Sequence, residues 1–253
     1  MSKNVKSVAK TTETSIQVIN ELRDRSAATI EELSDILGLA PSTVHRHLAT
    51  LRKHGYVVNN GDTYELGLQF LTIGGQIQRQ VTAYPMIKQK VDSLAAETGE
   101  RAQFIVEENG QRVYLYTEVG QSAVQTGAHV GKRGAIHTSA AGKAILAAYD
   151  RERVESIIDV CGLTGGYDGI TTREALFADL DRIRDRGYAF NRQETTAGVH
   201  AVGASVTAGG DVVGALSVSG PANRITDERF TKELPERILG AVNELELHIE
   251  HSV

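Results

Sequence analysis

The sequence predicts an α+β protein, with a small helical unit at the beginning of the chain and a larger unit of helices and antiparallel strands after it. In the first 75 residues, three short amphipathic helical patterns precede a tight hairpin signal. In the rest of the chain, alternating segments flank Asn109-Gly110 and Gly209-Gly210, and helical patterns separate them. Hairpins mixed with helices favour an antiparallel sheet over a doubly wound parallel sheet.

Composition excludes several classes of protein. The chain has 253 residues, of which 41% are hydrophobic and 23% charged, as is typical of globular proteins. No apolar run reaches membrane-spanning length, and the polar first residues lack the apolar core of a signal peptide, so we expect a soluble cytoplasmic protein. Cys161 is the only cysteine, which excludes an internal disulfide framework and a Cys-based zinc cluster.

The acidic balance of the chain lies entirely outside its opening segment. Residues 1–75 contain eight Lys or Arg and eight Asp or Glu, so the net charge of −5 comes from the remaining 19 basic and 24 acidic residues. The distribution of charge matters more than its sum. The net negative charge of the chain therefore does not exclude nucleic-acid binding by its opening segment.

Apolar side chains at helical spacing predict a first helix, which ends before a short connection at residues 26–28. Ile16, Ile19 and Leu22 mark its apolar face, and Val18 lies beside that face.

A capping box predicts the start of the second helix. Thr29 and Glu32 have the spacing at which side chains satisfy free backbone N–H groups at a helix start. Gly38 ends this helix. Its buried stripe is expected at Ile30, Leu33, Ile36 and Leu37.

The third helix begins at Pro41, since a missing N–H costs nothing in the first turn. Gly55 ends it after Lys53 and His54, whose positive charge suits the C-terminal end of the helix dipole. The segment "YVVNNGDTYEL" then predicts two strands around Asn60-Gly61. Three short helices and a hairpin are the plan of a winged helix-turn-helix.

The third helix has an apolar side and a cationic, hydroxyl-bearing side. Val44, Leu48 and Leu51 face the core at roughly 100° per residue. No acidic residue occurs between Gly38 and Tyr56. A narrow cationic helix suits the major groove of DNA. The candidate DNA-binding residues are Ser42, Thr43, His45, Arg46, Thr50 and Lys53.

These candidates have different expected roles. Arg46 could donate two parallel hydrogen bonds to a guanine edge. Ser42 and Thr43, at the helix start, are placed for phosphate or base contacts, and Lys53 for a phosphate contact. The alternative is an ordinary solvated polar face of a helix.

Five segments of the chain carry a specific resemblance. The segments "IEELSDILGLAPSTVHRHLATLRKHGYV" and "YELGLQFLTIG" come first. They are followed by "HTSAAGKAILA", "RDRGYAFNRQETTAGVHAVGASV" and "VVGALSVSGPANRIT". In this order they resemble the DNA-binding unit, the junction and the three effector-domain signatures of the IclR family of transcriptional regulators.

The resemblance implies an architecture and partners. It implies dimers, often tetramers, on palindromic operators of double-stranded DNA. The family usually carries an Arg early in the first helix, where Thr14 stands here, and Lys6 or Lys10 could replace that phosphate contact. The implied domains are a winged helix-turn-helix at 1–72, a linker helix at 73–84 and an effector-binding GAF-like domain at 85–253.

The expected linker at 73–84 contains glycine residues near its start and is followed by a proline. We expect a helix to about Thr82 that is broken near Pro85. Gly74-Gly75 is either a hinge or a helix cap, and we favour the cap.

A ligand site is expected around the segment "TSAAGK". Thr138 or Ser139 can cap a helix there, and the N–H groups of residues 140–142 would face outward and favour an anion. Ser217 and Ser219 alternate on a strand, so their hydroxyls share one side, and a solvent-facing side is the plain alternative.

The resemblance adds further positions to this site. Asn191 stands where the family is often acidic, and Ala201 where it often has Cys, so the effector is expected to be more anionic or less hydroxylated than is typical. Arg192 would point away from Asn191 if this segment is a strand. The candidate ligand-binding residues are Ala140, Ala141, Gly142, Asn191, Ala201, Ser217 and Ser219.

The enzyme motifs considered for this sequence are either incomplete or absent. A phosphate-binding loop would need Gly where His137 stands and Ser or Thr where Ala144 stands. No G-x-S-x-G elbow and no paired metal-ligand spacing occurs. His45 and His47 point about 200° apart on a helix, so they cannot bind the same metal ion. We therefore expect no enzyme, no cofactor and no metal ion.

The sequence thus predicts a ligand-responsive, DNA-binding transcriptional regulator of a catabolic pathway, whose operator affinity is modulated by a small organic acid. No membrane partner is expected. The alternatives are a DNA-binding protein without a ligand, a redox or metal sensor, and a small-molecule enzyme built on the C-terminal domain.

Overall fold

The computed structural model describes residues 7–81, 83–123 and 127–251. The described residues up to Val81 form one compact unit, and those from Ala83 onward form the other. Within the described residues, no helix is both long enough and apolar enough to cross a membrane.

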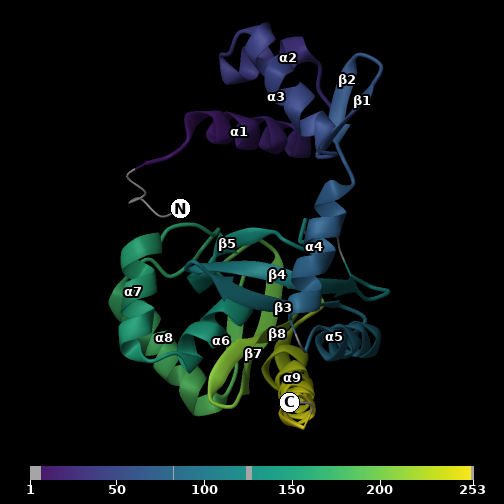
Figure 1. Ribbon diagram of the computed structural model, residues 1–253. Helices are drawn as coiled ribbons and strands as arrows, with labels where there is room; N and C mark the ends of the chain where they lie inside the picture. Colours follow the sequence, from purple (N-terminus) through teal and green to yellow (C-terminus); the bar gives the residue numbers. More distant parts are fainter. Residues whose placement is uncertain (1–6, 82, 124–126, 252–253) are drawn as a thin grey trace. The chain divides into compact units, whose positions relative to one another are not determined.

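The first unit contains four helices and a two-stranded hairpin among its described residues (Figure 1). The three helices before the hairpin and the hairpin itself enclose a small apolar core. The elements are α1 (Lys10–Arg25), α2 (Ile30–Leu37), α3 (Pro41–Lys53), β1 (Val57–Asn60), β2 (Thr63–Leu66) and α4 (Gln69–Gln80).

Local signals set the boundaries of α2. Thr29 and Glu32 form the predicted capping box, in which the Thr29 hydroxyl accepts from the Glu32 N–H and the Glu32 carboxylate accepts from the Thr29 N–H. Gly38 ends the helix with φ of 63°, a left-handed conformation that glycine adopts without strain. Leu33 is fully buried, whereas Ile36, which we expected in the same stripe, is exposed.

The buried face of α1 differs from the predicted one. Val18 and Leu22, four residues apart, are fully buried, and Ile19 is half-buried against the same core. Ile16 is 51% exposed, so its place on the apolar face was wrong. The helix uses the face centred on Val18 because that face meets α3 and β2.

The predicted hairpin is confirmed, but its two-residue turn is Gly61-Asp62, one position later than Asn60-Gly61, because Asn60 still belongs to β1. Strands β1 and β2 pair antiparallel from Val57 opposite Leu66 to Asn60 opposite Thr63. Val57 lies in the core, and Ala28 forms an isolated antiparallel β-bridge with Tyr64. These contacts hold the hairpin against the helices.

Helix α4 continues through both glycines of the linker. The predicted cap at Gly74-Gly75 is therefore wrong, because the helix ends only at Gln80. Two interior glycines cost about 2 kcal/mol relative to alanine, which the structure tolerates without ending the helix. Pro85 stands in the first turn of the next helix, and Thr82 lies outside the described residues.

The second unit is built on a six-stranded antiparallel sheet in the order β5-β4-β3-β8-β7-β6. Its elements are α5 (Tyr84–Thr98), β3 (Arg101–Glu108), β4 (Gln111–Val119), β5 (Arg133–Ala135), a 3₁₀ turn (Ile136–Thr138), α6 (Ala140–Ala148), α7 (Arg151–Cys161), α8 (Arg173–Arg186), β6 (Ala189–Arg192), β7 (Val199–Ala208), β8 (Asp211–Pro221), a π-helical turn (Arg229–Glu233) and α9 (Leu234–Glu250).

Both predicted hairpins of the second unit are confirmed. Asn109 and Gly110 have φ of 53° and 75°, which are the values of a tight two-residue turn between β3 and β4. Gly209 and Gly210 form the corresponding turn between β7 and β8. The antiparallel α+β class that these hairpins predicted is therefore the observed one.

Helices cover both faces of this sheet. Helix α6 packs on β3, β6, β7 and β8, with α8 against it, while α5 and α9 pack on the opposite face (Figure 1). Helix α7, which we did not predict, begins directly after its N-cap residue Asp150, whose carboxylate accepts from the N–H of Arg153. The main apolar core lies between α6 and the sheet.

Candidate functional site

Helix α3 presents a polar face because its apolar face is fixed in the core of the first unit. Val44, Leu48 and Leu51 are all buried, as predicted. The left-handed turn at Gly38 carries the chain directly from α2 into α3, with the Leu39 N–H bonded to the Ser34 carbonyl at 3.1 Å. The helix is therefore held by its inner side, and its other side is free for contacts.

The predicted DNA-binding residues share this outer side. All of them are exposed except Thr43, which is half-buried. The Thr43 hydroxyl accepts from Arg46 Nη2 at 3.4 Å, and the Thr50 hydroxyl donates to the Arg46 carbonyl at 2.9 Å. The exposed members are Ser42, His45, Arg46, Thr50 and Lys53.

The cations of α3 have no acidic partners among the described residues. Arg46, Arg52 and Lys53 are exposed, and no described carboxylate forms an ion pair with them. On α1, by contrast, Arg23 pairs with Asp24 and Arg25 with Glu21. Our candidate set omitted Arg52, although its position beside Lys53 in a segment without acids was a usable signal.

His47 has a structural role. Its Nδ1 lies 2.9 Å from the Ser15 hydroxyl, which joins α3 to α1. The Thr14 hydroxyl donates to the Lys10 carbonyl within α1, and Lys10 is exposed. The alternative contact at Lys6 lies outside the described residues.

A second candidate site is a small cavity between α6 and the sheet of the second unit. Its volume is about 60 Å³. The apolar part of its lining includes Ile105, Tyr114, Ala140 and Ala201. The polar part consists of Gln103, Arg112, Lys132, Ser139, Asn191, Thr195, Thr196, Ser217 and Ser219.

Strand register brings most of the predicted ligand residues to this cavity. Asn191 pairs with Ala201, and Ala201 pairs with Ser219, so three strands present these side chains in one row. Ser217 and Ser219 are 2% and 7% exposed, so the solvent-facing alternative for them was wrong. Ala140 also lines the cavity.

Two predicted residues lie beside the cavity without lining it. Ala141 and Gly142 are buried in the first turn of α6, where they pack against neighbouring backbone. Of the two possible caps, Ser139 is the one observed, and its hydroxyl accepts from the Gly142 N–H at 3.0 Å. The expectation that this N–H faces outward was therefore wrong. A side chain at Gly142 would collide with the Ile136 carbonyl, so close packing requires glycine there.

Asn191 is held by short hydrogen bonds at the cavity wall. Its Nδ2 donates to the Thr138 carbonyl at 2.6 Å and to the Thr195 hydroxyl at 2.9 Å. The neighbouring Arg192 is exposed, because successive side chains of β6 point to opposite faces. The side-chain direction expected for a strand at this segment is therefore observed.

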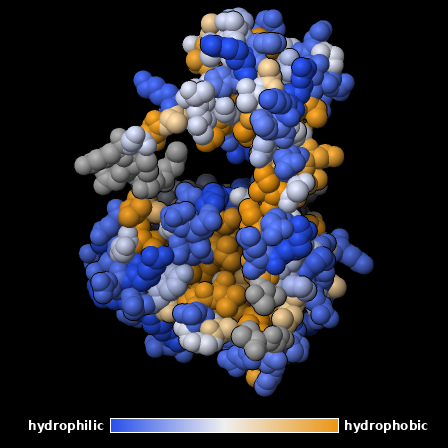
Figure 2. Space-filling view, in the orientation of Figure 1, coloured by the Kyte–Doolittle hydropathy of each residue, from blue (hydrophilic) through white to orange (hydrophobic). Residues whose placement is uncertain are grey.

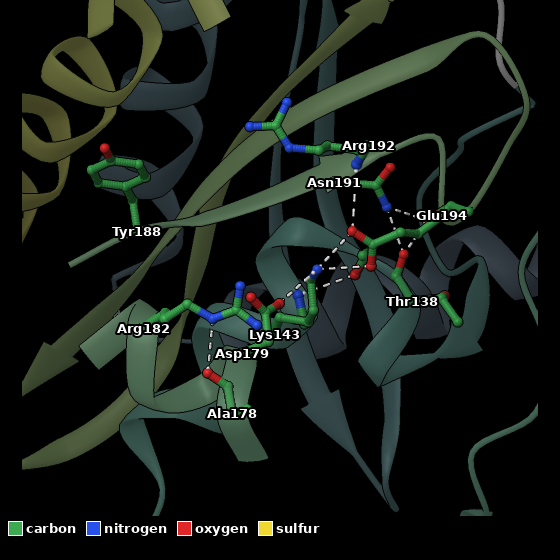
Figure 3. A network of polar contacts seen from close by, with 12 residues as sticks. Thr138, Lys143, Ala178, Asp179, Arg182, Tyr188, Asn191, Arg192 and Glu194 are labelled. Atoms are coloured by element: carbon green, nitrogen blue, oxygen red, sulfur yellow. Dashed lines mark hydrogen bonds and ion pairs between the residues drawn. The ribbon is translucent and has the colours of Figure 1, made fainter. Parts of the chain in front are cut away.

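An ion-pair network supports the same wall (Figure 3). Lys143 of α6 is 2% exposed, and its Nζ lies 2.7 Å from Glu194 and 3.0 Å from Asp179. Glu194 belongs to the loop after β6, and the next residue, Thr195, lines the cavity. The network therefore fixes the loop that closes one side of the cavity.

Sequence reasoning missed Gln103, Arg112 and Lys132 as cavity residues. Arg112 and Gln103 are each 5% exposed, and they reach the cavity from β4 and β3. The sequence analysis predicted strands on both sides of Asn109-Gly110, but it did not predict that these two polar side chains are buried at a cavity.

A buried histidine lies near the cationic part of this region. His137 is buried, and burial lowers the pKa of its ring, as do the positive charges of Arg112 and Lys143. The ring is therefore neutral at pH 7.

A helix-turn-helix with an outward cationic helix, joined to an antiparallel sheet unit of this kind, defines the class of helix-turn-helix transcriptional regulators. Two family models match the chain: the IclR helix-turn-helix domain over residues 15–61, and the bacterial transcriptional regulator IclR C-terminal domain over residues 80–246. The chain belongs to the IclR family of DNA-binding transcriptional regulators, as the resemblance predicted.

Individual relatives agree with this assignment. The chain is 33% identical over 241 residues to "Probable HTH-type transcriptional regulator ArcR" of Halobacterium salinarum, covering 93% of this chain and 92% of that protein. It is also similar to the Escherichia coli regulator KdgR, with 27% identity over 217 residues and coverage of 84% and 82%.

Solved structures share the fold. The IclR structure of Thermotoga maritima superposes with a TM-score of 0.82 at 20% identity, covering 95% of this chain and 99% of that one. An IclR homolog of Microbacterium hydrocarbonoxydans, complexed with 4-hydroxybenzoate, superposes with a TM-score of 0.74 at 23% identity, covering 94% and 99%.

Proposed function

We propose that this regulator responds to a small organic acid that binds in the cavity beneath α6 and changes the affinity of α3 for its operator. The observation that carries the proposal is the charge of the cavity. Its described lining contains the cations Arg112 and Lys132 and no acidic residue. A buried site of this charge favours an anionic ligand over a neutral or cationic one.

In this proposal the exposed side of α3 enters the major groove. Arg46 reads a guanine edge through two parallel hydrogen bonds, while Ser42, Thr43, His45 and Thr50 contact neighbouring bases or phosphates. Lys53 binds phosphate, and Arg52 does the same from the adjacent position. The absence of described carboxylate partners supports these roles, because the cations remain available to the DNA backbone.

The proposed ligand-binding residues are those of the cavity. Ser217, Ser219 and Asn191 contact the polar groups of the effector, and Ala140 and Ala201 leave space for it. Ala141 and Gly142 act indirectly by allowing α6 to pack closely on the sheet. The homolog complexed with 4-hydroxybenzoate supports an organic acid as the kind of molecule that this fold accommodates.

Self-association is part of the proposal, as a dimer or tetramer on a palindromic operator. One recognition helix reads too few base pairs for specificity in a genome, and two symmetry-related helices read two half-sites. Helix α4 contains no buried residue, and Leu71 and Ile77 are exposed apolar side chains on it (Figure 2). A second copy of the chain would cover such side chains.

The proposed domains are a DNA-binding domain at 1–72, a linker helix at 73–84 and an effector domain at 85–253, and the two compact units, which divide after Val81, support a division of the chain in this region. The effector shifts operator affinity to the extent that it binds one arrangement of these domains more tightly than another. Catalysis has no part in this proposal, and the protein acts in the cytoplasm on genes of a catabolic pathway.

The experiment that tests the proposal compares effector response with DNA binding. Operator duplexes are selected from random DNA, and a thermal-shift screen of small carboxylic acids, including 4-hydroxybenzoate, identifies a stabilising acid. The double variant Ser217→Ala and Ser219→Ala is expected to need at least about tenfold more acid for the same change in operator affinity, because two buried hydroxyls are lost. Fluorescence anisotropy measures both the affinity and the dose curve.

The matched control is Ser205→Ala, which removes a half-buried hydroxyl from β7 outside the cavity lining. It should leave the dose curve in place. An unmoved dose curve in the double variant would remove these serines from the ligand site. If no acid changes operator affinity, the alternative of a DNA-binding protein without a ligand is correct. Hydrolysis of esters or nucleotides by the protein would instead favour the enzyme alternative.

A further inference from the structure

Arg112 is a buried cation without an acidic partner in the described part of the chain. Its guanidinium lies at the wall of the cavity, and Nη1 donates to the Ala135 carbonyl at 3.1 Å and to the Thr138 hydroxyl at 2.8 Å. Its Nε is buried and has no hydrogen-bond partner. These acceptors are neutral, so they hold the group in position without balancing its charge.

Two acidic residues of this region, one opposite Arg112 and one in the loop beside the cavity, are engaged elsewhere. Glu107 lies directly opposite Arg112 in the β3–β4 pairing, yet its carboxylate binds Arg153 at 3.0 Å and the Tyr149 hydroxyl at 3.3 Å. Glu194 is taken by Lys143, as described above. A structural ion pair therefore does not account for Arg112. Burial of an unbalanced charge is costly, and a bound anion would offset that cost.

The fold makes room for the guanidinium at this position. Gly134 of β5 pairs with Arg112, and a methyl group on Gly134 would lie 2.8 Å from Nη2 and 2.9 Å from Cζ. The absence of a side chain at Gly134 thus leaves room for the guanidinium beside β5.

A second group at the cavity lacks a partner. Gln103 donates from Nε2 to Ser217 and Ser219 at 3.4 Å and 3.3 Å, and its buried Oε1 accepts no hydrogen bond. A hydroxyl group on the ligand suits this amide in either orientation, because a hydroxyl both donates and accepts.

The cavity also limits the size of its occupant. A buried water needs roughly 10–15 Å³ by the same measure, so about 60 Å³ corresponds to a handful of non-hydrogen atoms. Sites for drug-sized molecules are several times larger. The occupant is therefore a short-chain molecule unless the cavity opens.

Resting on the function proposed above, we propose that Arg112 is the residue that selects the effector, by binding its carboxylate. Gln103, Ser217 and Ser219 contact a hydroxyl group on the same molecule. The ligand class is a short-chain hydroxycarboxylic acid.

The first test needs no substitution. Calorimetric titration of the full-length protein with lactate and with its uncharged amide, lactamide, compares two molecules that differ in the group facing Arg112. Wild type should bind lactate at least about tenfold more tightly than lactamide, since a hydrogen-bonded charge pair is lost with the amide. Equal binding of the two probes would overturn the assignment.

Two variants then locate the effect. Arg112→Met should weaken lactate binding about 10- to 100-fold and leave lactamide binding unchanged. Gly134→Ala should weaken lactate binding as well, because its methyl group displaces the guanidinium. It displaces the end of a flexible side chain, so the fold should be retained. The control is Arg133→Met, which removes an exposed neighbouring cation paired with Glu108.

The outcomes separate this inference from the broader proposal. If Arg112→Met and Gly134→Ala both retain wild-type affinity for lactate, the anion is bound elsewhere and only the assignment to Arg112 falls. If wild type binds neither lactate nor glycolate but responds to another acid, the hydroxy-acid class is wrong. If no acid binds, both proposals fall.

Discussion

At the scale of single residues, Arg46 is the side chain whose removal best tests the DNA contact. It is exposed, lies at the centre of the α3 face and has no described carboxylate partner. Arg46→Ala should weaken binding to the selected operator by roughly 1–3 kcal/mol, because the proposed bidentate contact to a base edge is lost. Fluorescence anisotropy against the operator and against unrelated duplex DNA measures the change.

Arg23→Ala is the matched control, since Arg23 is exposed on α1 and already paired with Asp24. Its operator affinity should stay close to that of wild type. An equal loss on both DNAs in Arg46→Ala would assign Arg46 to the phosphate backbone, and an unchanged affinity would remove it from the interface.

His137 tests the electrostatics of the buried wall at the same scale. Burial and two neighbouring cations hold its pKa below the ordinary value of about 6.5, so the folded protein keeps the ring neutral where the unfolded chain takes up a proton. This contribution to stability is complete above about pH 6.5 and is lost as the pH falls toward the folded pKa. His137→Gln should therefore flatten the decline in the free energy of unfolding between about pH 7 and pH 5.

Urea unfolding at several pH values provides the measurement, and His129→Gln, at an exposed histidine, is the control. A decline in His137→Gln as steep as in wild type would show that other groups cause it.

At the scale of elements, one buried lysine adds ion pairs to the apolar packing of α6. Lys143 links it to α8 through Asp179 and to the loop after β6 through Glu194 (Figure 3). Lys143→Met should destabilise the protein by about 3–5 kcal/mol, because two mostly buried carboxylates lose their partner. Chemical denaturation followed by circular dichroism measures this loss.

Lys232→Met is its control, because the Lys232–Glu228 pair is exposed and such pairs contribute about 0–1 kcal/mol. Equal stabilities of Lys143→Met and Lys232→Met would mean that Glu194 and Asp179 find other partners in the variant.

At the scale of the whole molecule, local signals predicted the fold well, and distant contacts limited the prediction of the site. The capping box at Thr29 and the turn at Asn109-Gly110 depend on residues a few positions apart, so the sequence displays them directly. The contact from Arg112 to Thr138 spans 26 residues, and that from Lys143 to Glu194 spans 51. Their pairing depends on strand order, which a periodic pattern does not contain.

The same distinction explains the errors within the elements. Helical periodicity placed Ile16 and Val18 near one face of α1 but did not say which would meet α3. The glycines of α4 were taken for a cap because local propensity is only a weak guide inside a helix.

Every described side chain that lines the cavity comes from residues 103–219, whereas the exposed cations of α3 come from residues 46–53. Mutations in one stretch leave the other chemically intact. In the proposed function, one copy could acquire a different effector after gene duplication while keeping its operator, and the other could acquire a new operator while keeping its effector. Because these two stretches are separate in the gene, the proposed effector specificity and operator specificity can change independently.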